Sequence, residues 1–61
     1  MDIIKAYDNS LITIYTTLHG GKKYNVVYGK TYGYWSYYVG DKKLRMPTET
    51  HIDMILKIKE E

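Results

Sequence analysis

The first third of the chain alternates apolar and polar residues, which is the pattern of a half-buried β-strand. In residues 11–18, Ile12, Ile14 and Leu18 fall on one face of an extended strand, while Thr13, Tyr15 and Thr17 fall on the other. Residues 2–8 have a similar composition, and Asn9-Ser10 between the two runs is a typical turn pair. The sequence therefore predicts a first β-hairpin. The aliphatic face of its second strand consists of Ile12, Ile14 and Leu18.

Glycine-containing turns divide the following residues into three more predicted strands. These strands span residues 24–28, 34–39 and 42–46. Residues 29–33 form the loop between the first two, with a glycine at each end. Gly40-Asp41 suits a two-residue hairpin turn of type II′, because glycine readily adopts the positive φ that its first position requires. Pro47 ends the last strand because it has no N–H to donate to a neighbouring strand.

The remaining residues predict an amphipathic helix. Thr48 or Thr50 can cap its N-terminus, and the carboxylates that follow favour the positive end of the helix dipole. The apolar stripe expected to face the sheet consists of Ile52, Ile55 and Leu56, flanked by Met54 and Ile58. The helix is interpreted as a structural lid over one side of the sheet.

These elements predict a single domain over residues 1–61 that is mostly β with one C-terminal α-helix. Its expected architecture is a five-stranded antiparallel SH3-like barrel or half-barrel, built from a two-strand hairpin and a three-strand meander and closed by the helix. The length and the order of elements resemble in outline those of the seven-kilodalton archaeal chromatin proteins. The local feature that the resemblance includes is a Gly29-Lys30 loop between two strands.

Composition narrows the class of protein. A chain of 61 residues leaves little room for the deep substrate cleft of a typical enzyme, so an enzyme is not expected. No cysteine is present, which excludes disulfides and thiolate metal sites. Apolar runs are too short to span a membrane, and the N-terminus lacks the apolar core of a signal peptide. We therefore expect a cytoplasmic protein without a membrane partner.

Candidate chemical groups are few and isolated. His19 lies in a predicted glycine turn and His51 at the start of the predicted helix, and neither has a second metal ligand at a suitable spacing. Both are expected at the surface. Gly29-Lys30-Thr31 matches only the end of a phosphate-binding loop, because the upstream glycine is missing and no helix follows. No cofactor, metal or catalytic residue is therefore expected.

Charge is distributed unevenly along the chain, although the formal net charge is only +2. From His19 to Arg45, six lysine or arginine residues accompany a single aspartate, which gives this segment a net charge of +5. The remaining residues hold three lysines and six carboxylates, a net charge of −3. A basic segment of this kind favours an anionic partner, although solvated loops also collect lysine.

Eight tyrosines, one tryptophan and no phenylalanine indicate aromatic side chains whose polar ends reach water or a partner. The predicted two-residue hairpin turn sorts the strands that flank it into two faces. The core face is predicted to hold Trp35, Tyr37, Val39, Leu44 and Met46. If the register continues through the loop 29–33 with Tyr28 opposite Tyr34, the solvent face of the meander combines four tyrosines with two cations, and Asn25 points toward the core. The predicted binding residues are Tyr24, Val26, Tyr28, Lys30, Tyr34, Ser36, Tyr38, Lys43 and Arg45, of which Lys30 lies in a flanking loop.

Two classes of function follow from this predicted face. The leading hypothesis is a nucleic-acid-binding protein, in which tyrosines stack on bases and cations contact phosphates. The alternative is a protein-interaction module without catalysis, such as a small viral or mobile-element inhibitor of a host protein. A third interpretation is that tyrosine pairs only stabilise an exposed sheet face. An exposed edge strand at residues 2–8 also allows a homodimer by sheet extension.

Overall fold

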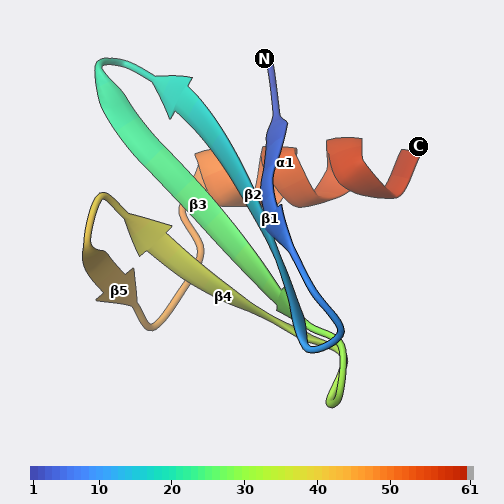
Figure 1. Cartoon of the computed structure of the whole chain (residues 1–61). Coiled ribbons are helices and arrows are strands. Elements are labelled where there is room, and N and C mark those ends of the chain that lie inside the picture. Colours follow the sequence, from blue (N-terminus) through green and yellow to red (C-terminus); the bar gives the residue numbers. More distant parts are fainter. Residues whose placement is uncertain (61) are drawn as a thin grey trace.

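The computed structural model describes residues 1–60, which form one antiparallel sheet with a helix packed on one of its faces (Figure 1). The elements are β1 (Ile4–Asp8), β2 (Ile12–His19), β3 (Lys22–Gly29), β4 (Tyr34–Val39), β5 (Lys42–Leu44) and α1 (Glu49–Glu60). Each strand pairs with its neighbours in sequence, so the order across the sheet is β1-β2-β3-β4-β5. The prediction of a mostly β chain with five antiparallel strands and a C-terminal helix is confirmed.

The sheet is open, and the predicted closure into an SH3-like barrel is not observed. The outermost strands, β1 and β5, are not paired with each other. Strand β5 has only three residues, shorter than the predicted strand 42–46, so it is too short to carry the sheet around to β1. In Figure 1 the strands fan out from the lower right, as expected for a strongly twisted open sheet.

Two hairpin turns depend on glycines with positive φ. Gly20 and Gly21 have φ values of 58° and 75°, which fits a type I′ turn between β2 and β3. At the turn between β4 and β5 only Gly40 has a positive φ, of 59°, which fits the predicted type II′ geometry. Both turns match the right-handed twist of the strands that they join.

The predicted register holds on one side of β4 and fails on the other. Tyr38 lies opposite Lys43, as the predicted hairpin requires. Across β3, however, Tyr28 lies opposite Trp35 and not opposite Tyr34. The cause is that Gly29 remains in the strand, so that the loop has the four residues 30–33. A shift of one residue moves every side chain of a strand to the other face, so the face of β3 is predicted wrongly.

The helix packs against β3 on the face of the sheet that carries the threonine and tyrosine side chains of β2, and the aliphatic face of β2 is left open. Thr17 is only 2% exposed, whereas Leu18 is 76% exposed. The covered face is made up of Thr13, Tyr15, Thr17, Tyr24, Val26, Tyr28, Trp35, Tyr37, Val39 and Leu44. The open face is made up of Ile12, Ile14, Thr16, Leu18, Lys23, Asn25, Val27, Tyr34, Ser36, Tyr38 and Lys43. The prediction that Trp35, Tyr37, Val39 and Leu44 share one face is confirmed, but Met46 lies beyond β5 and is exposed.

The stripe of helix α1 that faces the sheet differs from the predicted stripe. Its buried residues are His51 and Met54, and Ile55 and Ile58 on the same side are half-buried. Ile52 and Leu56, which were expected to face the sheet, are exposed. The stripe therefore keeps the predicted i, i+3, i+4 spacing but starts one residue earlier, with a histidine in it.

His51 is fully buried, and the expectation of a surface histidine is wrong. Thr48 caps the helix by accepting a hydrogen bond from the His51 N–H at its side-chain oxygen, over 3.3 Å. In return, the Thr48 N–H donates to His51 Nδ1 over 3.0 Å. This reciprocal pair is a capping box in which histidine takes the place of the usual glutamate or glutamine. It explains why a polar side chain heads the apolar stripe of the helix.

Candidate binding face

The aromatic and basic residues predicted to share one surface lie on different parts of the molecule. The one-residue shift places three of them, Tyr24, Val26 and Tyr28, on the covered face. Four others remain together on the open face: Tyr34, Ser36, Tyr38 and Lys43. Arg45 follows β5 and is exposed. The predicted surface of four tyrosines and two cations is therefore not formed.

On the covered face, the half-buried Tyr24 and Tyr28 pack against other aromatic rings. The ring of Tyr28 lies against the indole of Trp35, with 4.8 Å between their centroids. Tyr24 meets the buried ring of His51 edge to face at 5.4 Å. Val26 between them is fully buried. These contacts assign the three residues to the core, because aromatic rings in such arrangements stabilise a fold beyond the area that they bury.

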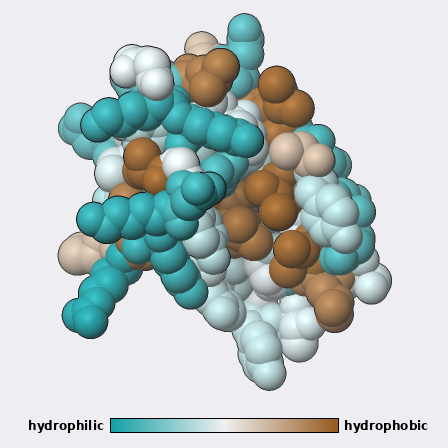
Figure 2. Space-filling view, turned by 60° about the vertical axis from the view of Figure 1, so that its left-hand side comes forward, coloured by the Kyte–Doolittle hydropathy of each residue, from teal (hydrophilic) through white to brown (hydrophobic). Residues whose placement is uncertain are grey.

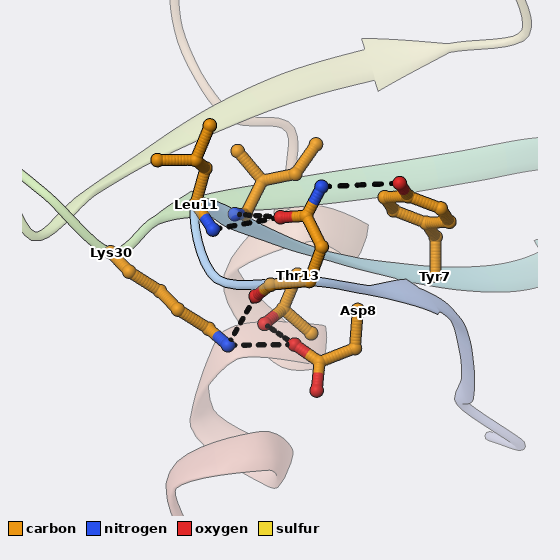
Figure 3. Close-up of polar contacts among 7 residues, drawn as sticks. Tyr7, Asp8, Leu11, Thr13 and Lys30 are labelled. Carbon is orange, nitrogen blue, oxygen red and sulfur yellow. Dashed lines mark hydrogen bonds and ion pairs between the residues drawn. The ribbon is translucent and has the colours of Figure 1, made fainter.

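Lys30 is held by an ion pair with Asp8, at the end of the sheet where the β1–β2 turn lies beside the loop after β3 (Figure 3). Its Nζ lies 2.8 Å from Asp8 Oδ1 and donates a second hydrogen bond to the carbonyl oxygen of Asn9 over 2.6 Å. Thr13 also donates to the same Asp8 carboxylate over 2.8 Å. The hydrogen bonds from Lys30 and Thr13 lower the pKa of Asp8 below its ordinary 3.8. Lys30 therefore stabilises the protein, and its predicted role in binding is not supported by its position.

Asn9 organises the neighbouring turn through its side chain. Its side-chain oxygen accepts hydrogen bonds from the N–H groups of Leu11 and Ile12, each over 2.8 Å. Its side-chain nitrogen donates to the hydroxyl of Tyr7 over 3.1 Å. The backbone N–H of Lys30 donates to the carbonyl of Leu11, which joins the turn to the loop after β3. This end of the sheet is built by local polar contacts and offers few free groups to a ligand.

The open face carries a broad hollow of about 550 Å³, which the sequence analysis did not predict. Apolar side chains dominate its floor. Figure 2 shows a band of apolar side chains on the surface next to a cluster of hydrophilic side chains. Its lining is Ala6, Ile12, Ile14, Thr16, Lys23, Asn25, Val27, Tyr38, Gly40 and Asp41. Asn25, which was expected to point into the core, lies here, and its side-chain oxygen accepts a hydrogen bond from the hydroxyl of Thr16. The hollow escaped prediction because the aliphatic face of a strand is normally the buried one.

One end of the open face is basic. The β2–β3 and β4–β5 turns lie at the same end of the sheet, at the left of Figure 1, and a hydrogen bond from Gly40 N–H to the Lys23 carbonyl joins them. Of the four lysines that follow these two turns, Lys23 and Lys43 lie on the open face, whereas Lys22 and Lys42 lie opposite His19 and Val39 on the covered side. Asp41 is the one carboxylate in the two turns. The hollow is therefore apolar along its length and positively charged at one end.

A second, smaller hollow lies beside β5 and retains part of the predicted surface. It has a volume of about 380 Å³ and is lined by Tyr34, Trp35, Ser36, Lys43, Leu44 and Arg45. Tyr34 is 57% exposed, and its ring lies 6.4 Å from that of Tyr32 in the adjacent loop. Two exposed tyrosines beside two cations suit stacking and phosphate contacts, over a much smaller area than predicted.

No known protein family, curated protein or solved structure matches this chain. Within residues 1–60, no helix has the length and apolar character needed to cross a membrane. Over the same residues, histidines and carboxylates do not gather into a group of three that would hold a metal ion. The open face, its hollow and its basic end are therefore the features on which a function can be argued.

Proposed function

We propose that this chain is a non-catalytic binding module that holds a protein segment against the open face of its sheet. The observation that carries the proposal is the hollow of about 550 Å³ on a sheet face that no element of residues 1–60 covers. Its floor of Ile12, Ile14 and Val27 is apolar, and a recessed apolar surface rimmed by polar residues is typical of sites that bind other proteins.

The small core supports the same proposal. Val26 and Met54 are the only apolar side chains of residues 1–60 that are fully buried. The chain exposes 4607 Å², whereas a compact monomer of 7.2 kDa is expected to expose about 4,100 Å². A partner on the open face would remove apolar surface from water at about 25 cal/mol for each Å² buried.

Nucleic-acid binding is the second candidate, and the smaller hollow favours it. Tyr34 in that hollow is exposed beside Lys43 and Arg45, which is the combination that single-stranded nucleic acids require. It ranks second because the covered tyrosines Tyr24 and Tyr28 no longer extend this surface across the sheet. Continuous stacking along a strand of nucleic acid needs such an extended row.

Nuclear magnetic resonance titration distinguishes the two candidates. The probes are two synthetic helical peptides with leucine at positions i, i+3, i+4 and i+7, one with glutamate and one with lysine at the remaining positions, and a short single-stranded DNA. We expect the glutamate peptide to shift the methyl signals of Ile14 and Val27, and the lysine peptide to bind more weakly because of the basic end. Ile14→Asp should abolish the shift of the Val27 methyl signals, while the exposed loop variant Tyr32→Asp should retain it.

The opposite pattern would reject the proposal. If neither peptide shifts the methyl signals of the open face, the hollow is not a protein-binding site. If DNA shifts Tyr34, Lys43 and Arg45 at low salt and loses this effect as salt is raised, the second candidate takes its place.

A further inference from the structure

The outer side of helix α1 combines exposed apolar residues with carboxylates. Ile52 and Leu56 are 46% and 56% exposed, and they lie one turn apart on the helix surface. Glu49, Asp53 and Glu60 share this side, because their spacing places them opposite the buried stripe that starts at His51. We call Ile52, Leu56 and these three carboxylates the acidic stripe. Lys57 and Lys59 border it in the last turn, so its negative charge is concentrated in the N-terminal half of the helix. A helix surface that exposes two large aliphatic side chains among carboxylates is itself an unpartnered amphipathic face.

The acidic stripe complements the hollow of the open face in both hydrophobicity and charge. The hollow offers Ile14 and Val27 to apolar side chains, and Lys23 and Lys43 at its basic end to carboxylates. The helix spans about 18 Å, since it has twelve residues with a rise of about 1.5 Å each. This length fits a molecule whose principal extents are 31 × 25 × 17 Å.

The two complementary surfaces lie on opposite sides of the same molecule. Helix α1 packs behind the sheet in the view of Figure 1, so its outer side faces away from the hollow. One chain cannot bring the two surfaces together, but two chains can. We propose that the acidic stripe of one copy docks into the hollow of a second copy, so that the chains associate head to tail. The inference rests on the proposed function, since it names the protein segment that the open face binds.

Charge favours this arrangement over contact between two open faces. The ionisable side chains that face the hollow or its basic end are Lys23, Lys43 and Asp41, so the face has a net positive charge. Two copies packed open face to open face would oppose like charges, whereas Glu49 and Asp53 of a docked helix would neutralise the lysines. The acidic N-terminal half of the helix is therefore expected at the basic end.

A homodimer by sheet extension, which the sequence allows, is less favourable than docking through the two faces. Strand β1 has a bulge between Lys5 and Tyr7, which disturbs the row of backbone groups that a new strand would need. Strand β5 has three residues, of which two are lysines. Bulges, short edge strands and lysines are the devices by which proteins prevent pairing at their sheet edges.

The arrangement is heterologous, and it therefore makes a distinctive prediction about mixtures. Each copy uses the hollow once and the acidic stripe once, so wild-type chains form rings or longer stacks. Ile14→Asp damages the hollow, and Leu56→Lys damages the stripe. Each variant alone should be monomeric in sedimentation velocity at low salt, with self-association at least about tenfold weaker than in the wild type. An equimolar mixture of the two should form a dimer and nothing larger, because one intact hollow and one intact stripe remain.

Controls separate loss of association from loss of fold. Leu56 is exposed, so Leu56→Lys leaves the core unchanged. Ile14 is half-buried, so the exposed Lys23→Glu serves as a second variant of the hollow. Lys23→Glu alone should weaken association, and mixing it with Asp53→Lys should restore association, because the charge pair between hollow and stripe is then reversed and not lost. Tyr32→Asp, an exposed aromatic residue outside both surfaces, should self-associate like the wild type. Each variant must still show cooperative unfolding by circular dichroism.

The possible outcomes also separate this inference from the proposed function. If the wild type remains monomeric at millimolar concentration while the glutamate peptide still binds the open face, the self-association is wrong and the binding module stands. If the chain neither associates nor binds the peptide, both proposals fail. If Ile14→Asp abolishes association and Leu56→Lys does not, the chains pack through their open faces, and the head-to-tail arrangement is overturned.

Discussion

His51 Nε2 donates a hydrogen bond to the backbone carbonyl of Tyr38 over 2.9 Å, although thirteen residues separate the two along the chain. The Thr48 N–H donates to the other ring nitrogen, which places the proton of the neutral ring on Nε2. One side chain therefore fixes the start of helix α1 and ties it to β4. The rings of Tyr24 and Tyr37 pack against this histidine at 5.4 and 5.6 Å.

Replacing His51 is expected to destabilise the fold strongly. His51→Ala removes the hydrogen bonds with the Tyr38 carbonyl and the Thr48 N–H and opens a cavity, so the free energy of unfolding should fall by about 3 kcal/mol. His51→Gln should cause a smaller loss, because glutamine at this helix position accepts the Thr48 N–H in an ordinary capping box. Urea denaturation followed by the fluorescence of Trp35 measures both. The exposed His19→Ala is the matched control, and a loss at His19 equal to that at His51 would contradict the assignment.

Two adjacent valines test which face of the sheet forms the core. Val26 is fully buried under the helix, whereas Val27 lies on the open face. Val26→Ala should lower the free energy of unfolding by about 2 kcal/mol, and Val27→Ala by less than about 1 kcal/mol. The comparison requires dilute protein, so that association through the open face does not add to the stability. Equal losses at the two positions would show that both faces are covered in solution.

Two tyrosines test the register between β3 and β4. Tyr28→Ala removes a ring that packs against Trp35 and should lower the free energy of unfolding by about 2–3 kcal/mol. Tyr34→Ala removes a side chain that is 57% exposed and should change the stability by less than about 0.5 kcal/mol. Thermal unfolding by circular dichroism distinguishes these outcomes. With the register predicted from the sequence, both changes would be mild, since both tyrosines would lie on the solvent face.

The ion pair between Asp8 and Lys30 predicts a dependence of stability on pH. Contacts that favour the ionised carboxylate lower the pKa of Asp8, so its stabilising effect is fully present above pH 3.8 and is lost as the pH falls through the lowered pKa. Asp8→Asn should therefore unfold at a lower temperature than the wild type at neutral pH, and the difference should close in strong acid. Asp41→Asn removes the same charge from an exposed turn at the other end of the sheet. A difference for Asp8→Asn that did not change with pH would exclude the ion pair as its cause.

The sequence predicts the number, order and type of the elements well, because turns and caps leave local signals. Gly40-Asp41 determines the β4–β5 hairpin through a backbone conformation that glycine adopts readily. Thr48 is one of the two predicted helix caps and is the residue that caps α1. Each of these features depends on residues that are close together in the sequence. Local chemistry is therefore sufficient to predict them.

The features that the sequence does not predict depend on contacts between distant residues. The side of β2 that is buried is decided by where the helix docks, and Thr17 is buried while Leu18 is exposed. The burial of His51 depends on a carbonyl group of β4, which the pattern within the helix does not indicate. The expected binding surface failed for the same reason, since it required the pairing of two strands through a loop of uncertain length. The hydrophobic pattern alone therefore assigned the wrong side of β2, of β3 and of the helix to the core.

The four-residue loop between Gly29 and Tyr34 has a consequence for how this protein tolerates change. Surface loops usually accept insertions and deletions, because an added residue alters little beyond the loop itself. Here the number of loop residues determines which side chains of β3 share a face with which side chains of β4. Adding or removing one residue would place the core side chains of one strand on the same face as the solvent-exposed side chains of the other. Relatives of this chain should therefore vary in the identity of residues 30–33 while keeping their number, or change that number by two at a time.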